Sequence, residues 1–318
     1  MKGKAKFGLG SLLLILAIIF GAAYFLGYIR LSSMPQQAAP GLPQPSQPSI
    51  AACPDTGLTA LKVAARNPLN ASLEYNAVTF KIVKDGQIIG TVTAGSSGLG
   101  TATNVECGES YELYVLGDGT YTSVKTSVVA DGATEEVYVN VPESTEVEFK
   151  VLDSTYSDVN GTSGWYQDVV VPSTAISFDS GSVNTYYIKI RAKDAAAQFG
   201  SDGLTNYICA DFNTAKFSKA NGVVISGLTE VDVPAALQAQ GMDKCWILPV
   251  IKSTEGEKTL TVTIRADLGD PGASDDIKFQ VFDGNYYQKN DGTIGIGVAD
   301  DAYTLVGEDD SWVSINIA

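Results

Sequence analysis

Histidine is absent from this 318-residue chain. Without an imidazole, a Ser-His-Asp or Cys-His catalytic site cannot be built, and a histidine-bearing zinc site is excluded. A glycosidase needs only two facing carboxylates, but the linear sequence nominates no pair among 36 acidic residues. The sequence therefore predicts a protein that is not an enzyme.

Cysteine is scarce as well, and the chain has only Cys53, Cys107, Cys209 and Cys245. No two of them have the Cys-x-x-Cys spacing of a redox site or a zinc ribbon. An even, low count is typical of structural disulfides in an oxidising compartment. Of the three connectivities that four cysteines allow, we expect the local one, Cys53–Cys107 with Cys209–Cys245, because it staples each predicted domain separately.

Acidic residues are missing from the first 54 positions, where Lys2, Lys4, Lys6 and Arg30 supply positive charge. The whole chain has 36 acidic and 21 basic residues, so residues 31–318 carry 21 − 4 = 17 basic residues and a formal net charge of 17 − 36 = −19. An acidic surface keeps an exported domain soluble and repels phosphate backbones. We therefore expect no nucleic-acid partner.

The one long apolar run is residues 7–29, which has no charged residue and lies between these basic residues. A helix of this length rises roughly 34 Å, enough to cross a hydrocarbon core of about 30 Å. More positive charge precedes the run than follows it, which places the N-terminus in the cytoplasm by the positive-inside rule. The sequence predicts a basic cytoplasmic tail (1–6), a transmembrane helix (7–29) and an exported remainder.

A cleaved signal peptide is the competing interpretation of the same run. Its apolar core would be residues 7–20, followed by the small-residue cleavage site Gly21-Ala22-Ala23. Apolar character nevertheless continues to residue 29, and Tyr24 and Tyr28 suit a membrane interface. We therefore expect an uncleaved anchor, with release after Ala23 as the alternative.

Residues 30–52 form a proline-rich linker with no apolar periodicity. Such a segment cannot bury enough surface to fold, and it prefers extended polyproline geometry. At about 3.1 Å per residue, it would lift the next domain as much as roughly 70 Å from the membrane. We expect it to act as a stalk.

Residues 53–142 have the alternation and turn pattern of a small β-sandwich. Residues 77–82 alternate polar with apolar, an Asp-Gly turn follows at Asp85-Gly86, and residues 88–92 return as the partner strand. Further strands are predicted at 110–115, 120–129 and 135–141. Strands at this spacing, without a helical period, are typical of a sandwich.

Four motifs follow one another in this region: Lys84-Asp85-Gly86, Ile88-Ile89-Gly90-Thr91-Val92, a glycine-rich turn at 96–100, and a strand that begins after Cys107-Gly108. Their order resembles the carboxypeptidase-regulatory, prealbumin-like modules, although Cys107 is not part of the general pattern. Such modules are usually non-catalytic spacers or adhesion domains. The resemblance therefore implies an architecture and no chemistry.

Residues 143–318 are also rich in predicted strands, at 147–151, 186–191, 207–209, 223–225, 246–251, 260–265, 277–281 and 312–317. One short helix is predicted at 233–240, with Asp232 as its N-cap and Pro234 in its first turn. Strands in this number suit a larger β-sandwich or a jelly roll. The predicted fold class is all-β, with two β-sandwich domains behind a transmembrane helix and a stalk.

Four carboxylates fall close together in one loop, at Asp267, Asp270, Asp275 and Asp276. Hard oxygen ligands are those that Ca²⁺ takes, but the spacing differs from that of an EF-hand. Loops between strands are also naturally rich in Asp and Gly. The sequence predicts either a weak calcium site or a solvated acidic loop, and no other cofactor.

Two aromatic doublets, Trp165-Tyr166 and Tyr286-Tyr287, lie next to Gly- and Asn-containing loops. Exposed rings can stack on sugars or anchor protein interfaces. In a strand, however, one of two adjacent aromatic residues usually faces the core. We expect these four residues to be candidate ligand contacts, with glycans as candidate partners.

Together these features predict a membrane-anchored extracytoplasmic protein, extracellular or periplasmic, with a structural or adhesive role. One alternative is a spike or capsid-associated structural protein of a membrane-containing virion. Another is a secreted carbohydrate-binding or hydrolytic protein. The expected partners are the membrane, other surface or virion proteins, and further copies of the chain.

Overall fold

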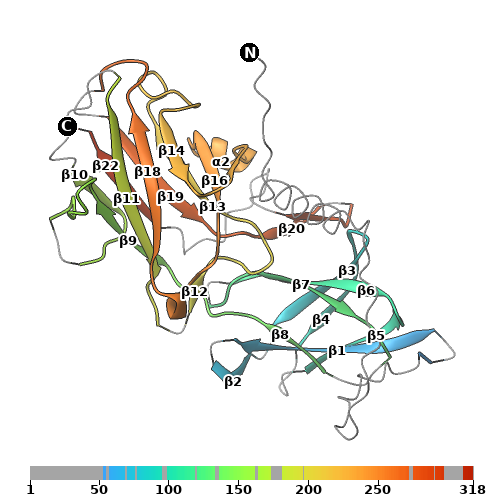
Figure 1. Ribbon diagram of the computed structural model, residues 1–318. Coiled ribbons are helices and arrows are strands. Elements are labelled where there is room, and N and C mark those ends of the chain that lie inside the picture. Colours follow the sequence, from blue (N-terminus) through green and yellow to red (C-terminus); the bar gives the residue numbers. More distant parts are fainter. Residues whose placement is uncertain are drawn as a thin grey trace, which may run out of the picture. The chain divides into compact units, whose positions relative to one another are not determined.

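The computed structural model describes residues 53–317, apart from 55–56, 69, 76, 95–98, 119, 133–135, 162–163, 173–180, 196, 272–274, 290 and 297–310. The predicted transmembrane helix and stalk lie outside these residues. Within the described part, no helix is long and apolar enough to cross a membrane. Nearly every element there is a β-strand, so the all-β prediction is confirmed (Figure 1).

The first sandwich is built from two sheets. In one sheet, β1 (Leu58–Asn67) pairs antiparallel with β2 (Asn70–Tyr75) and β5 (Leu99–Glu106), and parallel with β8 (Glu136–Asn140). The other sheet has the order β4-β3-β6-β7, formed by Gln87–Thr93, Thr79–Lys84, Ser110–Val115 and Val124–Val129. Inward-facing residues of both sheets, including Val63, Phe80, Ile82 and Leu113, form one core.

The turn between β3 and β4 follows from its two residues. Asp85 and Gly86 have φ values of 51° and 77°. A two-residue turn that matches the twist of its strands needs positive φ at both positions, and the Asp-Gly pair tolerates this geometry. The predicted hairpin is therefore present.

Three strands of this sandwich, β1, β2 and β5, were not predicted. The sequence of β1 is rich in Ala, Lys, Arg and Leu, which favour helices in isolation. The strand nevertheless has partners on both edges, and its Val63 and Ala65 are fully buried. In β5, a Cβ on Gly100 would lie 2.3 Å from Val92 Cγ1. Packing, rather than propensity, selects the strand conformation here.

The second sandwich has a six-stranded and a four-stranded sheet. The larger sheet has the order β10-β22-β19-β13-β16-β15, formed by Val169–Pro172, Trp312–Asn316, Asp276–Phe282, Asn206–Phe212, Lys244–Leu248 and Glu230–Val231. The smaller sheet has the order β14-β18-β11-β9, formed by Val223–Ser226, Lys258–Arg265, Val183–Ala192 and Val147–Leu152. Two short pairs complete the strands: β12 (Gln198–Phe199) with β17 (Ile251–Lys252), and β20 (Tyr286–Gln288) with β21 (Ile294–Ile296).

The spatial order of the strands in this second sandwich resembles that of an immunoglobulin-type fold, but β14, at the position of strand D, precedes β16, at the position of C′, along the chain. The order β9-β11-β18-β14 corresponds to strands A, B, E and D, and β16-β13-β19-β22 corresponds to C′, C, F and G. The short β10 pairs in parallel with the last strand, β22. Residues 143–318 were predicted to form a larger β-sandwich or a jelly roll, and the strand order is that of the larger sandwich.

The core of the second sandwich lies between strands β11 and β19. Alternate residues of β11 (Tyr186, Ile188 and Ile190) and of β19 (Ile277, Phe279 and Val281) are buried in it. Antibody domains join the corresponding strands by a disulfide. In this protein, buried apolar side chains of β11 and β19 pack together where antibody domains have that disulfide.

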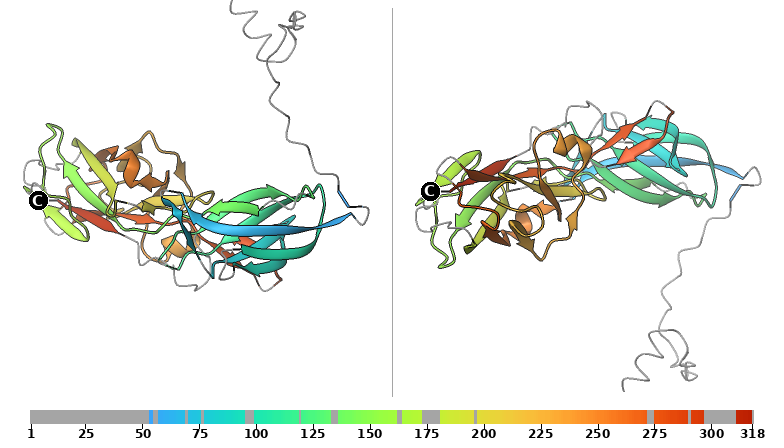
Figure 2. Two further views of the ribbon diagram at one scale, coloured as in Figure 1. Left: turned by 90° about the horizontal axis from the view of Figure 1, so that it is seen from below. Right: turned by 90° about the horizontal axis from the view of Figure 1, so that it is seen from above.

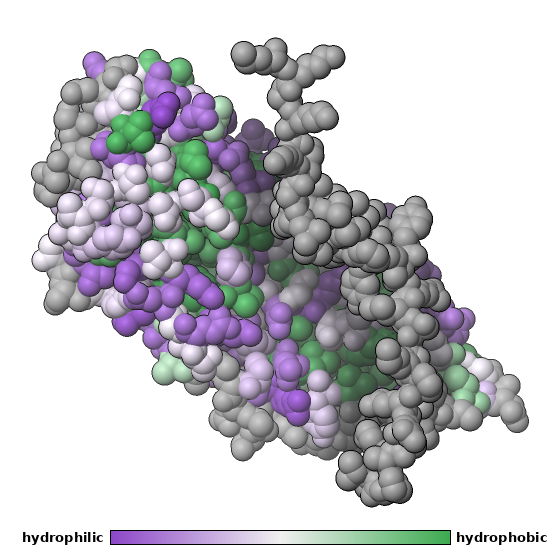
Figure 3. Space-filling model, viewed as in Figure 1, coloured by the Kyte–Doolittle hydropathy of each residue, from purple (hydrophilic) through white to green (hydrophobic). Residues whose placement is uncertain are grey.

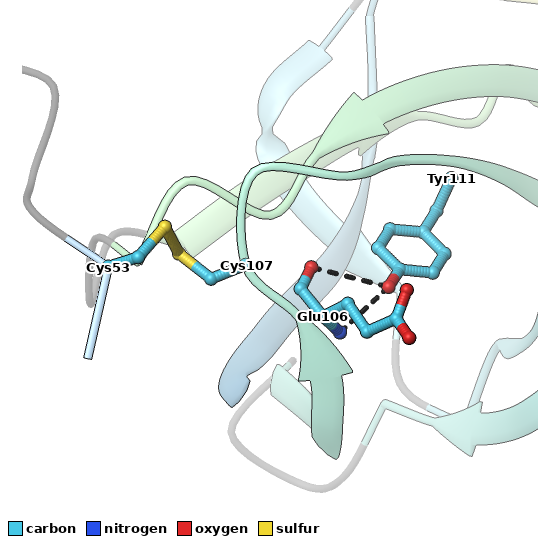
Figure 4. Close-up of a disulfide and its surroundings, with 4 residues drawn as sticks. All are labelled: Cys53, Glu106, Cys107 and Tyr111. Atoms are coloured by element: carbon cyan, nitrogen blue, oxygen red, sulfur yellow. Dashed lines mark hydrogen bonds between the residues drawn. A yellow bond between two sulfur atoms is a disulfide. The ribbon is translucent and has the colours of Figure 1, made fainter. Parts of the chain in front are cut away.

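The disulfides are the two local pairs. Cys53–Cys107 ties the chain ahead of β1 to the turn between β5 and β6 (Figure 4). Beside it, Tyr111 accepts a hydrogen bond from the Glu106 amide at 2.8 Å, which secures the same turn. Cys209–Cys245 links β13 to β16, where the two cysteines are directly opposite each other and fully buried.

The one described α-helix, α2 (Ala235–Gln238), is shorter than the predicted helix at 233–240. Pro234 occupies the N-cap position and no side chain caps the helix, so the prediction of Asp232 as the cap is wrong. Leu237 is fully buried and packs in the cluster around the Cys209–Cys245 disulfide. The helix is held by this contact rather than by a cap.

The predicted boundary near residue 142 separates two hydrophobic cores, since Val141 belongs to the first and Val147 to the second. Both belong to one compact unit, Ile50–Ala318. Strands of the second sandwich also return to the first: β21 lies beside the turn between β3 and β4 (Figure 2). The division into domains at 53–142 and 143–318 stays a prediction.

Candidate ligand-binding face

Strand β11 presents every second side chain to solvent. Tyr187, Lys189 and Arg191 point outward, and the buried residues between them point into the core. On either side, β9 and β18 add outward-facing Glu148, Lys150, Thr259 and Thr261. We call the outward-facing side chains of β9, β11 and β18, with those of residues 153–166 that pack on them, the outer face.

A returning segment brings a tryptophan to this face. After β9 the chain turns back, so that Val159 donates to the Val151 carbonyl at 2.9 Å and Tyr166 exchanges backbone hydrogen bonds with Phe149. Tyr166 packs against the core, and its hydroxyl accepts a hydrogen bond from the Val151 amide. Trp165 precedes it by one residue, so its side chain lies on the opposite side, on the outer face.

The Trp165 ring is stacked on the Arg191 guanidinium, whose central carbon is 4.4 Å from the ring centroid. Arg191 is held in place by Glu148, at 2.9 Å through Nε and 2.8 Å through Nη2. Trp165 and Arg191 line an open depression of about 520 Å³, together with Lys193, Ser253 and Glu257. An aromatic ring, two cations and a carboxylate thus meet in one concave site.

Three lysines on or next to the outer face are each paired with a carboxylate. Lys193 lies 2.6 Å from Glu146, Lys189 lies 2.5 Å from Glu257 and Lys150 lies 3.5 Å from Asp158. The bond from Lys193 lowers the pKa of Glu146 and raises the pKa of the lysine. Lys150 and Lys189 are direct cross-strand neighbours, so the separate carboxylates also relieve a like-charge repulsion.

A second aromatic pair lies on the same face. The rings of Tyr156 and Tyr187 are stacked, with centroids 4.2 Å apart and planes inclined by 12°. Tyr156 is 62% exposed although stacked, and its φ of 63° is in the left-handed region. Asp153 holds this turn by accepting hydrogen bonds from Thr155 and Ser157 at 2.7–3.0 Å.

The predicted doublet Trp165-Tyr166 therefore divides into a ring on the outer face and a ring against the core. Tyr286 and Tyr287 lie in β20, which pairs with β21, and only their backbone positions are described. Sequence reasoning missed Tyr156, Tyr187 and Arg191. The outward alternation of β11 is a signal that could have identified Tyr187 and Arg191, whereas the position of Tyr156 depends on the turn.

The predicted calcium ligands occupy different surroundings. Asp267 accepts hydrogen bonds from the amide and hydroxyl of Ser218, which lower its pKa. Asp275 accepts a hydrogen bond from the side-chain amide of Asn213 at 2.8 Å, and Asp276 accepts one from the Ser314 hydroxyl. In the described part of the chain, no three acidic or cysteine side chains converge as a metal site. Calcium binding by Asp267, Asp270, Asp275 and Asp276 stays a prediction.

No protein-family model matches the chain, and no curated protein matches it. Among solved structures, it is similar to BcpA, the major pilin subunit of Bacillus cereus, at 13% identity over 81% of this chain and 69% of that chain, with a TM-score of 0.28. It is similar to the RrgB pilus protein of Streptococcus pneumoniae at 12% identity (81% and 58%, TM-score 0.31). A DUF3823 family protein of Parabacteroides merdae matches at 13% identity (82% and 98%, TM-score 0.24). Likenesses this remote carry no argument about function.

Proposed function

We propose that this protein is a structural or adhesive surface protein, anchored in a membrane by residues 7–29 and without a catalytic site. The observation that supports this is the arrangement of its cysteines: all four form disulfides, one within each sandwich, behind an apolar run bracketed by positive charge. Disulfides form and persist outside the cytoplasm. The two sandwiches would then stand on the extracellular or periplasmic side, on the stalk of residues 30–52.

The charged groups of the outer face favour binding over catalysis. Glu148 and Glu257 each form an ion pair, and the hydrogen bond from Lys193 lowers the pKa of Glu146. A general acid or base would instead need a pKa near the working pH. In the first sandwich, two facing sheets with the Asp85-Gly86 hairpin support the resemblance to a non-catalytic, prealbumin-like module.

The test is the topology of the full-length protein in its membrane. We expect the protein to stay in the membrane pellet through high-salt and carbonate washes, and to start at residue 1 when extracted. Protease added outside intact cells should remove the region from Cys53 onward. A mature protein starting at Tyr24 would remove the anchor from the proposal, and recovery in the cytosolic fraction with reduced cysteines would contradict export.

A further inference from the structure

We propose that the outer face binds a neutral glycan chain, through the Tyr156–Tyr187 pair at one end and the Trp165–Arg191 pair at the other. The inference rests on the adhesive role proposed above and adds the chemical class of its ligand. Four features of the face support it: the spacing of the rings, the pairing of the charges, the built turn under Tyr156 and the covered strand edge.

The two ring pairs are set apart by the sheet itself. Tyr166 lies opposite Phe149, which places Trp165 beside Lys150, and Lys150 lies opposite Lys189 on β11. The backbone of Trp165 is therefore two strand spacings across and two residues along from that of Tyr187. This places their Cα atoms about 12 Å apart. A single sugar is too short to contact both rings. An extended oligomer lying across the strands can contact both.

The surface between the rings suits hydroxyl groups. It carries Lys150, Lys189 and Glu148, each held in an ion pair, and the hydroxyls of Thr259 and Thr261 on β18 lie beside it, on the other side of β11. These side chains provide hydrogen-bond donors and acceptors at fixed positions. Because Lys150, Lys189 and Arg191 each have a carboxylate partner, the surface between the rings carries little net charge, and a polyanion or polycation meets no complementary field there. In Figure 3 the surface over β9 and β11 is mostly white and purple, without a broad apolar patch.

Sugar rings present an apolar face of C–H groups, and such a face packs flat on an aromatic ring. Tyr156 is suited to this contact because most of its side chain is exposed. A non-glycine residue at positive φ is strained, and such strain persists only where surrounding structure imposes it. Hydrogen bonds from Thr155 and Ser157 to Asp153 impose it here. The turn thus holds the exposed Tyr156 ring against Tyr187 in spite of the cost of a strained backbone.

A peptide ligand fits this face less well. A peptide would add to a free strand edge or fill an apolar groove. The edge of β9 is already covered by the returning segment, through the contacts of Val159 and Tyr166. The depression beside Trp165 is lined largely by charged and small side chains. The ligand that fits the outer face is therefore more polar than an amphipathic helix or an extended apolar strand.

Binding is tested with the full-length protein in detergent micelles, passed over immobilised mannan, dextran, xylan, β-glucan and chitin. The variants are Tyr156→Ala and Trp165→Ala. Tyr138→Ala is the matched control, because Tyr138 is an exposed ring (40%) with Arg66 at 5.3 Å from its centroid, but in the first sandwich. Tyr156→Ala alters an exposed side chain, so the fold should survive, and circular dichroism checks this.

We expect retention on at least one polysaccharide, competed by its oligosaccharides and not by the monosaccharide. Each outer-face variant should weaken retention by about tenfold or more, while Tyr138→Ala leaves it unchanged. No retention on any of the five polysaccharides overturns the proposal, as does retention that survives both variants. Self-association that is lost in Tyr156→Ala would overturn it in favour of a second copy of the chain. None of these outcomes depends on the topology test, so the two proposals fail separately.

Discussion

Asp211 is a side chain whose environment opposes its charge. It lies on β13, and its pKa is raised by burial first and then by the carboxylates of Asp243 and Asp276, with Lys278 acting in the other direction. A carboxyl with a raised pKa in the folded state binds protons more readily there than in the unfolded chain. Its ionisation therefore costs stability above the folded pKa, and this cost disappears as the pH falls below the unfolded value of about 3.9.

We expect Asp211→Asn to raise the thermal midpoint at pH 7 and to lose this advantage near pH 3.5. The gain should be below about 1 kcal/mol, because the side chain is only partly buried and solvent screens its neighbours. Thermal melts between pH 3.5 and 7 measure it.

Asp267→Asn is the control, and its expected effect on the thermal midpoint has the opposite sign. Ser218 lowers the pKa of Asp267, so that carboxylate stabilises the fold above the unfolded pKa and loses this effect in acid. The control should therefore lower the midpoint at pH 7. A fall of the midpoint in Asp211→Asn at pH 7 would contradict the assignment.

Sequence reasoning at this scale identified residue types but not their directions. The doublet Trp165-Tyr166 predicts that one ring faces the core, yet only the register opposite Phe149 decides that it is Tyr166. The Asp267–Asp276 loop shows the same limit. The carboxylates are close in sequence, but their partners come from two other parts of the chain, Asn213 and Ser218 after β13 and Ser314 in β22.

The two disulfides differ in the elements they join. Cys53 is exposed and Cys107 is half-buried, at the place where the predicted stalk enters β1. Cys209 and Cys245 are fully buried between β13 and β16. By chain entropy, each should stabilise its sandwich by roughly 4 kcal/mol, for sequence separations of 54 and 36.

We expect a water-soluble reductant to open Cys53–Cys107 first in the folded protein, because thiol–disulfide exchange needs access to a sulfur atom. Alkylation of the native protein followed by peptide mapping measures the order. The first sandwich should then show faster amide exchange in β1 and β5, while β13 and β16 serve as the internal control. Alkylation of Cys209 before Cys107 would contradict the expectation.

Elements with strong local patterns were predictable, and elements that depend on partners were not. The alternation in β11 and the Asp85-Gly86 turn can be recognised from the local sequence alone. Strands β1 and β5 carry none, because Ala, Gly and Thr become strand residues there only through their neighbours. Strand order is likewise a long-range property, so the choice between sandwich and jelly roll stayed open until the pairings were known.

The two sandwiches are joined by more than the chain that connects them. The Lys125 amide donates to the Asp202 carbonyl at 2.8 Å, and the Asp202 amide donates to the Ser123 carbonyl at 3.2 Å. Leu204 and Ile294 of the second sandwich pack on the buried Val83 and Tyr114 of the first. The split into two cores was predictable from strand spacing, but this return of the second sandwich was not, since nothing local marks its partner.

These contacts predict that the sandwiches unfold together in one transition. Gly203 provides the sharpest test, because a Cβ at this position would lie 2.1 Å from the Lys125 carbonyl oxygen. Gly203 has a φ of 76°, and so does Gly256, around which a Cβ would meet no atom within 4 Å. The two alanine variants therefore share the strain of positive φ, about 1 kcal/mol. Only Gly203→Ala also separates the strands at the junction.

We expect scanning calorimetry to give one transition for the unmodified chain and for Gly256→Ala, with a slightly lower midpoint in the variant. Gly203→Ala should cost a further 1–3 kcal/mol, roughly, as overpacking does. It should also divide the heat absorption into two steps, one for each core, because each keeps its own inward-facing residues. A single transition of Gly203→Ala at the midpoint of Gly256→Ala would mean that the junction accommodates the added Cβ, and it would contradict this expectation. Two transitions already in the unmodified chain would mean that residues 53–142 and 143–318 melt as independent domains.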